Sequence, residues 1–297
     1  MKEKAVEKGY AKINLHLDVT GILDGGYHAV STVMQSVTLC DEITLSEIKI
    51  APVPSFSISC DRSDVPCDER NLAYRAAMLF CEKSGISLSA RIDIAKNIPM
   101  AAGMAGGSTD GAAVLRGLNK ALGEPLTASE LCDIGSSLGA DVPFCIVGGT
   151  LYADGKGDIL HEFPKMPDCH IVIACDGESV STPWAYRLLD STYDNFEIGA
   201  YEPKDITPLR NALFAGSISA VAENIYNIFE SPVLALRPVA ADIKDTLLSS
   251  GAIAAMMSGS GPSVFGIFES RENAQSAAAR LKKKGYTPYI CQPVTPN

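Results

Sequence analysis

The stretch from Lys96 to Asn119, KNIPMAAGMAGGSTDGAAVLRGLN, decides the fold of this chain. A predicted strand ends at its proline, and a run of Gly, Ala and Met follows. Ser108, Thr109 and Asp110 are residue types that accept backbone N–H bonds at a helix start, and leucines then recur with helical spacing. The stretch therefore predicts a strand, a glycine-rich loop and a helix that begins at these three residues.

The loop has the composition of an anion-binding site. Its glycines, at positions 103, 106, 107 and 111, leave backbone amides uncovered where the positive end of the helix dipole points. The alternative is a small-residue loop that only lets the helix pack closely on a sheet. Because four glycines, helix-capping residues and a preceding strand occur together, we favour phosphate binding.

The loop matches neither of the two common nucleotide-binding signatures. The P-loop needs a lysine before its Ser or Thr, and here Gly106 and Gly107 lead directly to Ser108. The dinucleotide signature G-x-G-x-x-G fails as well, because Met104 and Ala105 separate Gly103 from the next glycine. The phosphate-binding interpretation therefore needs support from the rest of the chain.

The composition is that of an ordinary globular protein, with 46% hydrophobic and 20% charged residues among 297. Lys and Arg number 25 against 35 acidic residues, which gives a net charge of −10. This balance argues against a nucleic-acid-binding protein, because phosphate contacts along a duplex need a basic face. A nucleotide substrate stays compatible with it, since backbone amides and one or two lysines can bind its phosphates.

Cysteine and histidine usage points to a reducing compartment and to no metal site in the protein. The nine cysteines include no Cys-x-x-Cys pair, and the four histidines show no metal-ligand spacing. The N-terminal sequence MKEKAVEKGY has no apolar core of signal length, and no stretch approaches the length of a membrane span. We therefore expect a cytoplasmic protein with no membrane segment.

The N-terminal residues predict a β-hairpin. Residues 10–20 alternate between apolar and polar side chains, Asp24-Gly25-Gly26 supplies turn chemistry, and residues 28–39 read as a second strand. Lys12 and Asn14 share the polar face of the first strand. They could be solvated polar residues of a half-exposed strand, and the pattern alone does not decide.

Further elements follow in order up to the middle of the chain. We expect strands at 42–50 and 55–60, a helix from Asn71 to Lys83, a strand at Leu88–Ala95, the glycine-rich loop with its helix, and a helix from the Thr127 capping box to Leu138. Gly139 can supply a left-handed turn after that helix. Asp141 would then lie in a loop before a strand at 144–147, where it could simply be a turn aspartate that bonds its own backbone.

The polar, proline-bearing segment at 155–168 predicts a boundary between two domains, residues 1–158 and 159–297. Beyond it we expect a strand at 170–175, helices near 183–190, 208–221 and 233–249, strands at 252–257 and 263–268 around a glycine turn at 258–261, a helix at 271–284 and a strand at 287–291. Strand, helix, two strands, helix and strand is the split βαβ order. The chain is therefore predicted to be an α+β protein with a ferredoxin-like second domain.

Five segments together resemble the GHMP kinase superfamily, and the resemblance covers nearly the whole chain in the same order. They are Ala11-Lys12-Ile13-Asn14, Gly26-Tyr27-His28, the loop from Pro99 to Asp110, Gly139-Ala140-Asp141-Val142-Pro143 and the glycine turn at 258–261. The resemblance implies a ribosomal-S5-like N-terminal domain joined to a ferredoxin-like C-terminal one. The first, second and fourth segments are similar to those of members that phosphorylate a cytidine diphosphate-linked polyol.

The resemblance also implies residue roles. Asp141 matches the family's catalytic base and Lys12 the lysine beside it, which keeps the aspartate ionised. ATP would be the phosphoryl donor, with Mg²⁺ carried on its phosphates, so no protein metal ligand is implied. The implied phosphate-binding residues are Pro99, Met100, Ala101, Ala102, Gly103, Met104, Ala105, Gly106, Gly107, Ser108 and Thr109. The implied substrate-binding residues are Asn14, Tyr27, His28, Thr182 and Tyr186, with the two tyrosines stacking on the cytosine and His28 hydrogen-bonding it.

The loop departs from the commonest family pattern. Alanines stand at 101, 102 and 105 where many members have glycine, and they keep their amides accessible provided φ stays negative, as we expect here. Thr109 replaces a serine, and Asp110 replaces an asparagine. We interpret Asp110 as a helix cap outside the anion pocket and not as a ligand of Mg²⁺, and we assign it no role in the site.

Two other functions remain open from the sequence. One is a GHMP kinase that acts on homoserine, mevalonate or a sugar, against which the Tyr27-His28 turn argues. The other is a nucleotide-binding regulator on the same fold, against which the presence of both Lys12 and Asp141 argues. For the kinase that the resemblance implies, the expected partners are ATP and a cytidine diphosphate-linked polyol, not nucleic acid or membrane, and the expected state is a monomer or weak homodimer.

Overall fold

The structure, a computed structural model, describes residues 2–175, 177, 180–193, 196 and 201–294. The chain forms two compact units. Unit 1 takes the N-terminal residues up to Ala11, then 40–100 and 105–148, and unit 2 takes 12–39, 101–104 and the chain from 149 onward. These two units do not coincide with the predicted domains 1–158 and 159–297. The boundary at residue 158 stays a prediction about the domains of the sequence.

The larger sheet contains strands from both units. Its order is β3-β4-β2-β1-β8, and β5 pairs with both β2 and β6. The strands are β1 (Ala5–Ile22), β2 (His28–Ile50), β3 (Ser55–Cys60), β4 (Leu88–Ala95), β5 (Thr150–Asp154), β6 (Ile159–Glu162) and β8 (Tyr226–Asn227). The predicted pair of N-terminal strands is confirmed, but both strands are longer than expected. β1 starts at Ala5 and not at residue 10, and β2 includes the separate strand that was predicted at 42–50.

Both faces of β1 are buried in its central part, from Ala11 to Val19. The apolar residues there have the low exposure expected of a core, and so do the polar ones, with Lys12 4% and Asp18 0% exposed, whereas Val6 and Ile22 near the ends of the strand are exposed. The alternative of solvated polar residues on a half-exposed strand is therefore wrong. Burial lowers the pKa of His16 on the same face to about 4, so its ring is neutral at physiological pH.

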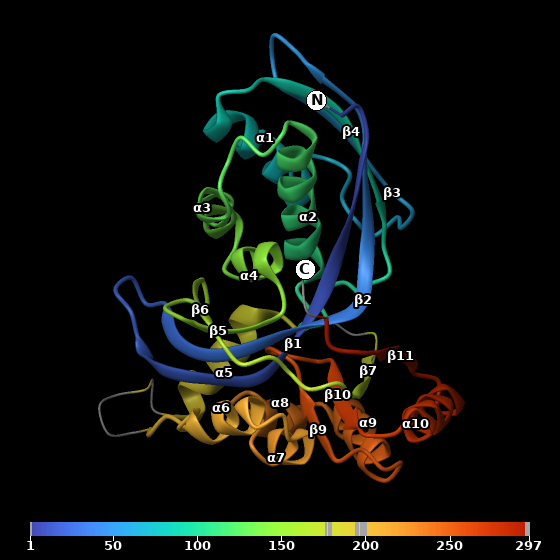
Figure 1. The fold of residues 1–297 in the computed structure, drawn as a ribbon. Coiled ribbons are helices and arrows are strands. Elements are labelled where there is room, and N and C mark those ends of the chain that lie inside the picture. The colour runs from blue at the N-terminus through green and yellow to red at the C-terminus, as the bar shows by residue number, and fades with distance from the viewer. Residues whose placement is uncertain (1, 176, 178–179, 194–195, 197–200, 295–297) are drawn as a thin grey trace. The chain divides into compact units, whose positions relative to one another are not determined.

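Four helices belong to unit 1, and Figure 1 shows them together on the same side of β3 and β4. They are α1 (Leu72–Ser84), α2 (Gly106–Ala121), α3 (Ala128–Leu138) and α4 (Asp141–Val147). The predicted start is confirmed for two of them, α1 and α3. Asn71 accepts a hydrogen bond from the Ala73 amide at the start of α1, and Thr127 forms a capping box with Glu130 at the start of α3.

The segment around Asp141 differs from the prediction. Residues 141–147 form helix α4 and not a loop followed by a strand, and Gly139 has φ 170°, an extended conformation and not a left-handed one. Pro143 fits the first turn of α4, where its missing N–H would have no helical partner anyway. An apolar run as short as this one cannot distinguish a buried helix from a buried strand by its pattern.

The start of α2 was also predicted wrongly. The helix begins at Gly106, with Ala105 as its N-cap residue and no side chain as a cap. The hydroxyl of Thr109 donates instead to the carbonyl of Tyr10, 2.9 Å away, and Asp110 is buried inside the first turns. The side chains of Thr109 and Asp110, which the sequence assigned to helix capping, therefore make tertiary contacts instead.

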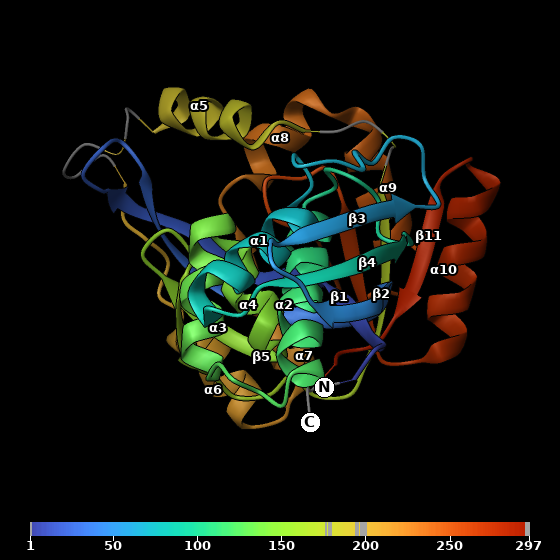
Figure 2. The same ribbon diagram turned by 90° about the horizontal axis from the view of Figure 1, so that it is seen from above.

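Unit 2 contains an antiparallel sheet of order β11-β7-β10-β9, which confirms the predicted split βαβ arrangement. Its strands are β7 (His170–Cys175), β9 (Ala254–Met257), β10 (Val264–Phe268) and β11 (Thr287–Cys291). Helices α9 (Pro238–Leu248) and α10 (Arg271–Lys283) pack against it through a shared apolar core, and Figure 2 shows α10 beside β11.

Two of the helices predicted for unit 2 are each divided. The helix expected at 208–221 is α6 (Thr207–Phe214) and α7 (Ile218–Glu223), separated at Gly216, which has φ 65°. The helix expected at 233–249 is α8 (Glu230–Leu236) and α9, separated at Arg237 because Pro238 cannot continue the hydrogen bonding of a preceding helix. Helix α5 (Thr182–Thr192) lies where it was predicted.

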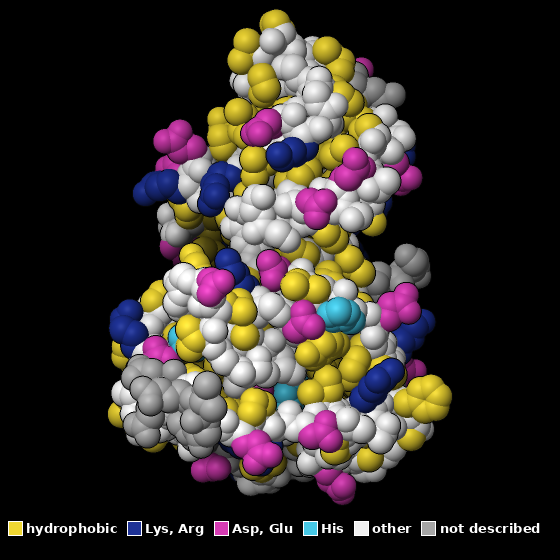
Figure 3. Space-filling model, turned by 90° about the vertical axis from the view of Figure 1, so that its left-hand side faces the viewer, with side chains coloured by type: hydrophobic (Ala, Val, Ile, Leu, Met, Phe, Trp, Pro, Cys, Tyr) yellow, Lys and Arg dark blue, Asp and Glu magenta, His cyan; other side chains and the backbone are white. Residues whose placement is uncertain are grey.

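The surface carries charges of both signs. On the face drawn in Figure 3, Lys and Arg side chains are interspersed with Asp and Glu, without a broad basic field. None of the helices among the described residues combines the length and the apolar character that a membrane crossing requires.

Candidate active site

The glycine-rich loop that precedes α2 has an unusual backbone. Ala101, Gly103 and Ala105 have φ values of 49°, 74° and 58°. The expectation that the alanines keep negative φ is therefore wrong at two of the three positions. A left-handed conformation costs an alanine roughly 1–2 kcal/mol, so packing around the loop must hold it there.

In unit 2, residues 101–104 lie against the glycine turn at 258–261. The hydroxyl of Ser258 donates to the Gly103 carbonyl at 3.2 Å, and the Lys12 amide donates to the Met104 carbonyl at 3.2 Å. A side chain at Gly103 would collide with the backbone carbonyl of Ser258. Glycine is needed at 103 because two backbone segments meet there and because φ is positive.

The ammonium of Lys12 is held in this part of unit 2. Its Nζ donates to Oδ1 of Asn14 at 2.7 Å, and a Cβ added at Gly259 would lie 3.6 Å from the same Nζ. Asn14 donates in turn to the hydroxyl of Thr32, which donates to the His16 carbonyl. Lys12 and Asn14, two predicted site residues, are thus connected in a buried chain of hydrogen bonds beside the glycine turn.

In unit 1, a buried ionic cluster lies under the first turn of α2. Nζ of Lys96 contacts the carboxylates of Asp41 and Asp110 and donates to the carbonyl of Gly106 at 3.0 Å. Asp41 also accepts the backbone N–H groups of Asn97 and Ile98. The cluster connects Lys96, which follows β4, to Gly106 and Asp110 in the first turns of α2.

Asp110 is therefore a member of this cluster and not the outer helix cap that we expected. Burial, together with the neighbouring Asp41 carboxylate, raises the pKa of Asp110 to about 8, although the Lys96 ammonium acts in the opposite direction. Oδ1 of Asp110 has no hydrogen-bond partner among the described residues. Such an environment favours a protonated carboxyl at neutral pH.

Asp141 is the first residue of α4, and the first turn of a helix favours a carboxylate because of the helix dipole. The position of α4 is fixed from α2, because Arg116 donates to the carbonyl of Cys145 at 2.5 Å. Lys12 belongs to unit 2 and Asp141 to unit 1, so the predicted contact between their side chains stays a prediction.

The residues predicted to bind a base are partly brought together in unit 2. The rings of His28 and Tyr186 lie 4.5 Å apart between centroids, at an angle of 35°. Tyr27 is 58% exposed, and the ammonium of Lys156 lies 4.1 Å from its ring centroid. Thr182, at the start of α5, has its hydroxyl 3.3 Å from that of Ser260, which connects α5 to the glycine turn.

Sequence reasoning missed two groups of residues that contact the predicted site residues or lie beside them. One is Asp190, whose carboxylate lies 2.6 Å from Nε2 of His28. The spacing of Tyr186 and Asp190, four residues apart on a predicted helix, could have placed both on one helix face. The other is the pair of Asp41 and Lys96. These two residues contact each other but lie 55 positions apart in the sequence, so no local pattern could connect them.

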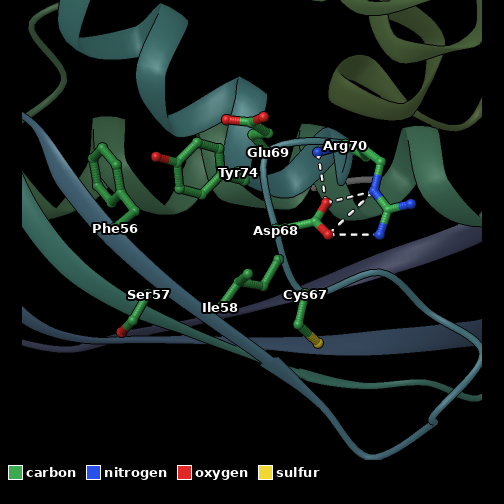
Figure 4. A pocket seen from close by; sticks show the side chains of 8 residues that line it. All are labelled: Phe56, Ser57, Ile58, Cys67, Asp68, Glu69, Arg70 and Tyr74. Atoms are coloured by element: carbon green, nitrogen blue, oxygen red, sulfur yellow. Dashed lines mark hydrogen bonds and ion pairs between the residues drawn. The ribbon is translucent and has the colours of Figure 1, made fainter.

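Unit 1 also has a hollow of about 460 Å³ that the sequence did not predict. Figure 4 shows Phe56 and Tyr74 lining it, with Asp68 and Arg70 joined by hydrogen bonds at one end.

Across the described residues, no three His, Cys, Asp or Glu side chains are grouped so that they could hold a metal ion.

Comparison with known proteins identifies the family. The N-terminal domain of the GHMP kinases matches residues 71–149, and their C-terminal domain matches residues 209–287. A Caldicellulosiruptor saccharolyticus protein named 4-diphosphocytidyl-2-C-methyl-D-erythritol kinase is 41% identical over 93% of this chain and 92% of its own length. The protein of the same name from Acetivibrio thermocellus is 40% identical over 97% of this chain and 98% of its own length.

A solved structure agrees with this assignment over the whole fold. The crystal structure of a 4-(cytidine 5'-diphospho)-2C-methyl-D-erythritol kinase superposes with a TM-score of 0.81 at 28% identity, and covers 98% of this chain and 100% of the other. The chain has an α+β architecture and a glycine-rich loop before α2, and it is 41% identical to a named kinase over 93% of its length. Together with the two matching family domains, these findings show that this chain belongs to the GHMP kinase family.

Proposed function

We propose that this protein transfers the γ-phosphoryl group of ATP to the 2-hydroxyl of 4-diphosphocytidyl-2-C-methyl-D-erythritol, a step of non-mevalonate isoprenoid biosynthesis. The observation that carries the proposal is the identity of about 40% to proteins named for this activity, over more than nine-tenths of the chain. The meeting of His28 and Tyr186 in unit 2 supports a site for a flat base.

In this proposal Asp141 is the base that takes the proton from the substrate hydroxyl as its oxygen attacks the γ-phosphorus. Lys12 keeps the aspartate ionised and polarises the hydroxyl, because a nearby ammonium favours the charged form of a carboxyl. Phosphoryl transfer depends on positioning and charge neutralisation more than on covalent chemistry. One carboxylate, one ammonium, a loop of amides and a metal ion carried on the phosphates are therefore sufficient.

The phosphates of ATP would lie on the loop from Pro99 to Thr109, with Mg²⁺ entering as part of the nucleotide. Two observations support this use of the loop. The backbone at Ala101, Gly103 and Ala105 is in the left-handed conformation, as in anion-binding turns, and α2 starts directly behind it. The Lys96 cluster holds the carbonyl of Gly106, which restrains the first turn of that helix.

For the acceptor, we propose that Tyr27 and Tyr186 stack on the cytosine, that His28 hydrogen-bonds its edge, and that Asn14 and Thr182 bind the remainder of the substrate. Stacking on an aromatic ring contributes about 1–3 kcal/mol per base and accepts any base. Selectivity must then come from hydrogen bonds at the base edge, where a mismatch leaves a polar group unpaired.

The remaining expectations belong to the same proposal. The enzyme acts on small molecules in the cytoplasm, as a monomer or weak homodimer, without nucleic acid or membrane partners. Residues 1–158 and 159–297 are its two sequence domains, and each contains one of the two matching family segments.

An ADP-release assay tests the function directly. The purified protein is incubated with MgATP and one of three acceptors, namely the cytidyl diphosphate substrate, homoserine or mevalonate. We expect ADP release with the cytidyl substrate only, and phosphorus NMR should locate the new phosphate on its 2-hydroxyl. Turnover of homoserine or mevalonate at a comparable rate would assign a different acceptor. Tight ATP binding without turnover of any acceptor would favour a regulator.

A further inference from the structure

The geometry points to Asp190 as a positioning residue that fixes the tautomer of His28 and thereby the preference for a cytosine over a uracil. This inference rests on the proposed function, because it deepens the account of how the acceptor's base is recognised. Asp190 is not itself expected to touch the base; it acts through the imidazole.

The pairing of the two side chains is close and partly shielded. Oδ1 of Asp190 lies 2.6 Å from Nε2 of His28, and the two side chains are 27% and 12% exposed. An ionised carboxylate can only accept hydrogen bonds, so Nε2 must carry the proton that joins them. In the neutral imidazole the other nitrogen, Nδ1, is then an acceptor.

The position of the imidazole is set by one face of α5. Tyr186 and Asp190 lie four residues apart on this helix, so both project from the same face. The first packs against the His28 ring at 4.5 Å, and the second fixes the rotation of that ring by holding Nε2. Phe196 approaches the ring edge-on at 5.8 Å. Helix α5 therefore presents the stacking ring and the orienting carboxylate together.

The two bases differ at the position that an acceptor nitrogen can distinguish. Cytosine carries an exocyclic amino group, a donor, where uracil carries a carbonyl oxygen, an acceptor. An acceptor Nδ1 pairs with the amino group and leaves the uracil oxygen facing another lone pair. A charged imidazole would donate from both nitrogens and would favour uracil instead. The state of His28 therefore decides which base is accepted.

Three variants test the role of Asp190. Asp190→Ala removes the partner of Nε2, and Asp190→Glu keeps a carboxylate that can reach it. The matched control is Asp154→Ala, because Asp154 pairs with Nε2 of His161 at 3.0 Å in the same unit but on a more exposed surface. Thermal melting confirms that each variant is folded before any other comparison.

The tautomer is read without any substrate. Nitrogen NMR of protein with isotope-labelled histidine gives signals from only four residues, and His28→Gln assigns the one of interest. We expect wild type and Asp190→Glu to show a protonated Nε2 and an unprotonated Nδ1, and Asp190→Ala to show a mixture of tautomers. A doubly protonated His28 in wild type, or an unchanged His28 signal in Asp190→Ala, overturns the inference.

Selectivity is read from kcat/KM for the cytidyl and uridyl diphosphate acceptors. We expect the cytidyl-to-uridyl ratio of kcat/KM to fall by about tenfold or more in Asp190→Ala, because one hydrogen bond between Nδ1 of His28 and the base edge distinguishes the two bases. The change should occur in KM and not in kcat. Asp190→Glu should recover most of the ratio, and Asp154→Ala should keep it. An unchanged ratio in folded Asp190→Ala overturns the inference.

The two proposals fail in different ways. If wild-type protein phosphorylates neither diphosphate, the proposed function is wrong, while the nitrogen spectrum still decides whether Asp190 sets the tautomer. If wild type is active and selective but Asp190→Ala keeps the full ratio, the function stands and the role of Asp190 is refuted.

Discussion

The carboxyl group of Asp110 contacts the buried ammonium of Lys96 beneath the start of α2, with Oδ2 lying 2.7 Å from Nζ. Asp41 contacts the same ammonium, so two carboxyl groups share one cation. The cluster has a negative net charge whenever both are ionised, and burial disfavours such a charge. Since the ammonium also donates to the Gly106 carbonyl, the protonation of Asp110 is linked to the first turn of α2, which follows the glycine-rich loop.

We expect the stability of the protein to fall with rising pH because of Asp110. In the unfolded chain this carboxyl ionises near its ordinary pKa of 3.8, whereas in the folded protein its pKa is about 8. Between these values only the folded state holds the proton, so the free energy of unfolding decreases as pH rises, by up to about 1.4 kcal/mol per pH unit. Asp110→Asn, which cannot ionise, should lack this decrease and exceed wild type in stability near pH ~8.

Urea denaturation of wild type and variant between about pH 5 and pH 8 measures the effect. Asp68→Asn is the matched control. Hydrogen bonds from Arg70 hold the pKa of Asp68 at about 2, so this exposed carboxylate stays ionised over the whole range. Its variant should follow the wild-type curve. Parallel curves for Asp110→Asn and wild type would contradict the assignment of the raised pKa.

Asp141→Asn should abolish most turnover and leave ATP binding intact. Asparagine keeps the size of the side chain but cannot take a proton, and removal of a general base typically costs about 10²–10⁴-fold in rate. Steady-state assays measure the rate, and calorimetry measures ATP affinity. Asp133→Asn, on the exposed face of α3, is the control carboxylate.

Lys12→Met should lower the rate similarly, and the double variant should be less than additive because the two side chains act on one proton transfer. A rate within about threefold of wild type in Asp141→Asn would remove this residue from the mechanism.

Gly103→Ala should impair the phosphate loop more than its conformation alone explains. The residue has φ 74°, and an added Cβ would also meet backbone carbonyl oxygens of the glycine turn. Gly216→Ala is matched in conformation, with φ 65°, but its Cβ would enter open space. We expect Gly216→Ala to lose about 1 kcal/mol of stability and keep its KM for ATP.

Gly103→Ala should lose more stability and show a KM for ATP raised by about tenfold or more, because the loop must move away from the turn at 258–261. Equal melting temperatures and equal KM values in the two variants would show that the contact with the turn is unimportant.

Ala105→Gly should stabilise the protein. Alanine has φ 58° and ψ 30° here, a left-handed conformation that costs about 1 kcal/mol or more relative to glycine. Release of this strain should raise Tm by about 2–4 °C, as scanning calorimetry can measure. Ala112→Gly, at a buried position inside α2, should lower Tm instead, because glycine is a poor helix former. A lower Tm in both variants would mean that the loop is not strained at 105.

The sequence alone determined the features that depend on neighbouring residues. Alternation predicted the N-terminal strands, the capping box at Thr127 predicted the start of α3, and the Gly and Pro positions predicted the loop before α2 and the glycine turn at 258–261. Caps, turns and periodicity are set by a few adjacent side chains and backbone angles, so they survive in a single sequence without the fold.

Only the tertiary structure decided how distant segments meet. It made 141–147 a helix, placed two loop alanines at positive φ, and buried the polar face of β1. It also brought Asp41 and Asp110 to Lys96, and Asp190 to His28 across an interval of 162 residues. Such contacts depend on register and packing across the whole chain, because a buried charge must find its partner wherever the fold places one.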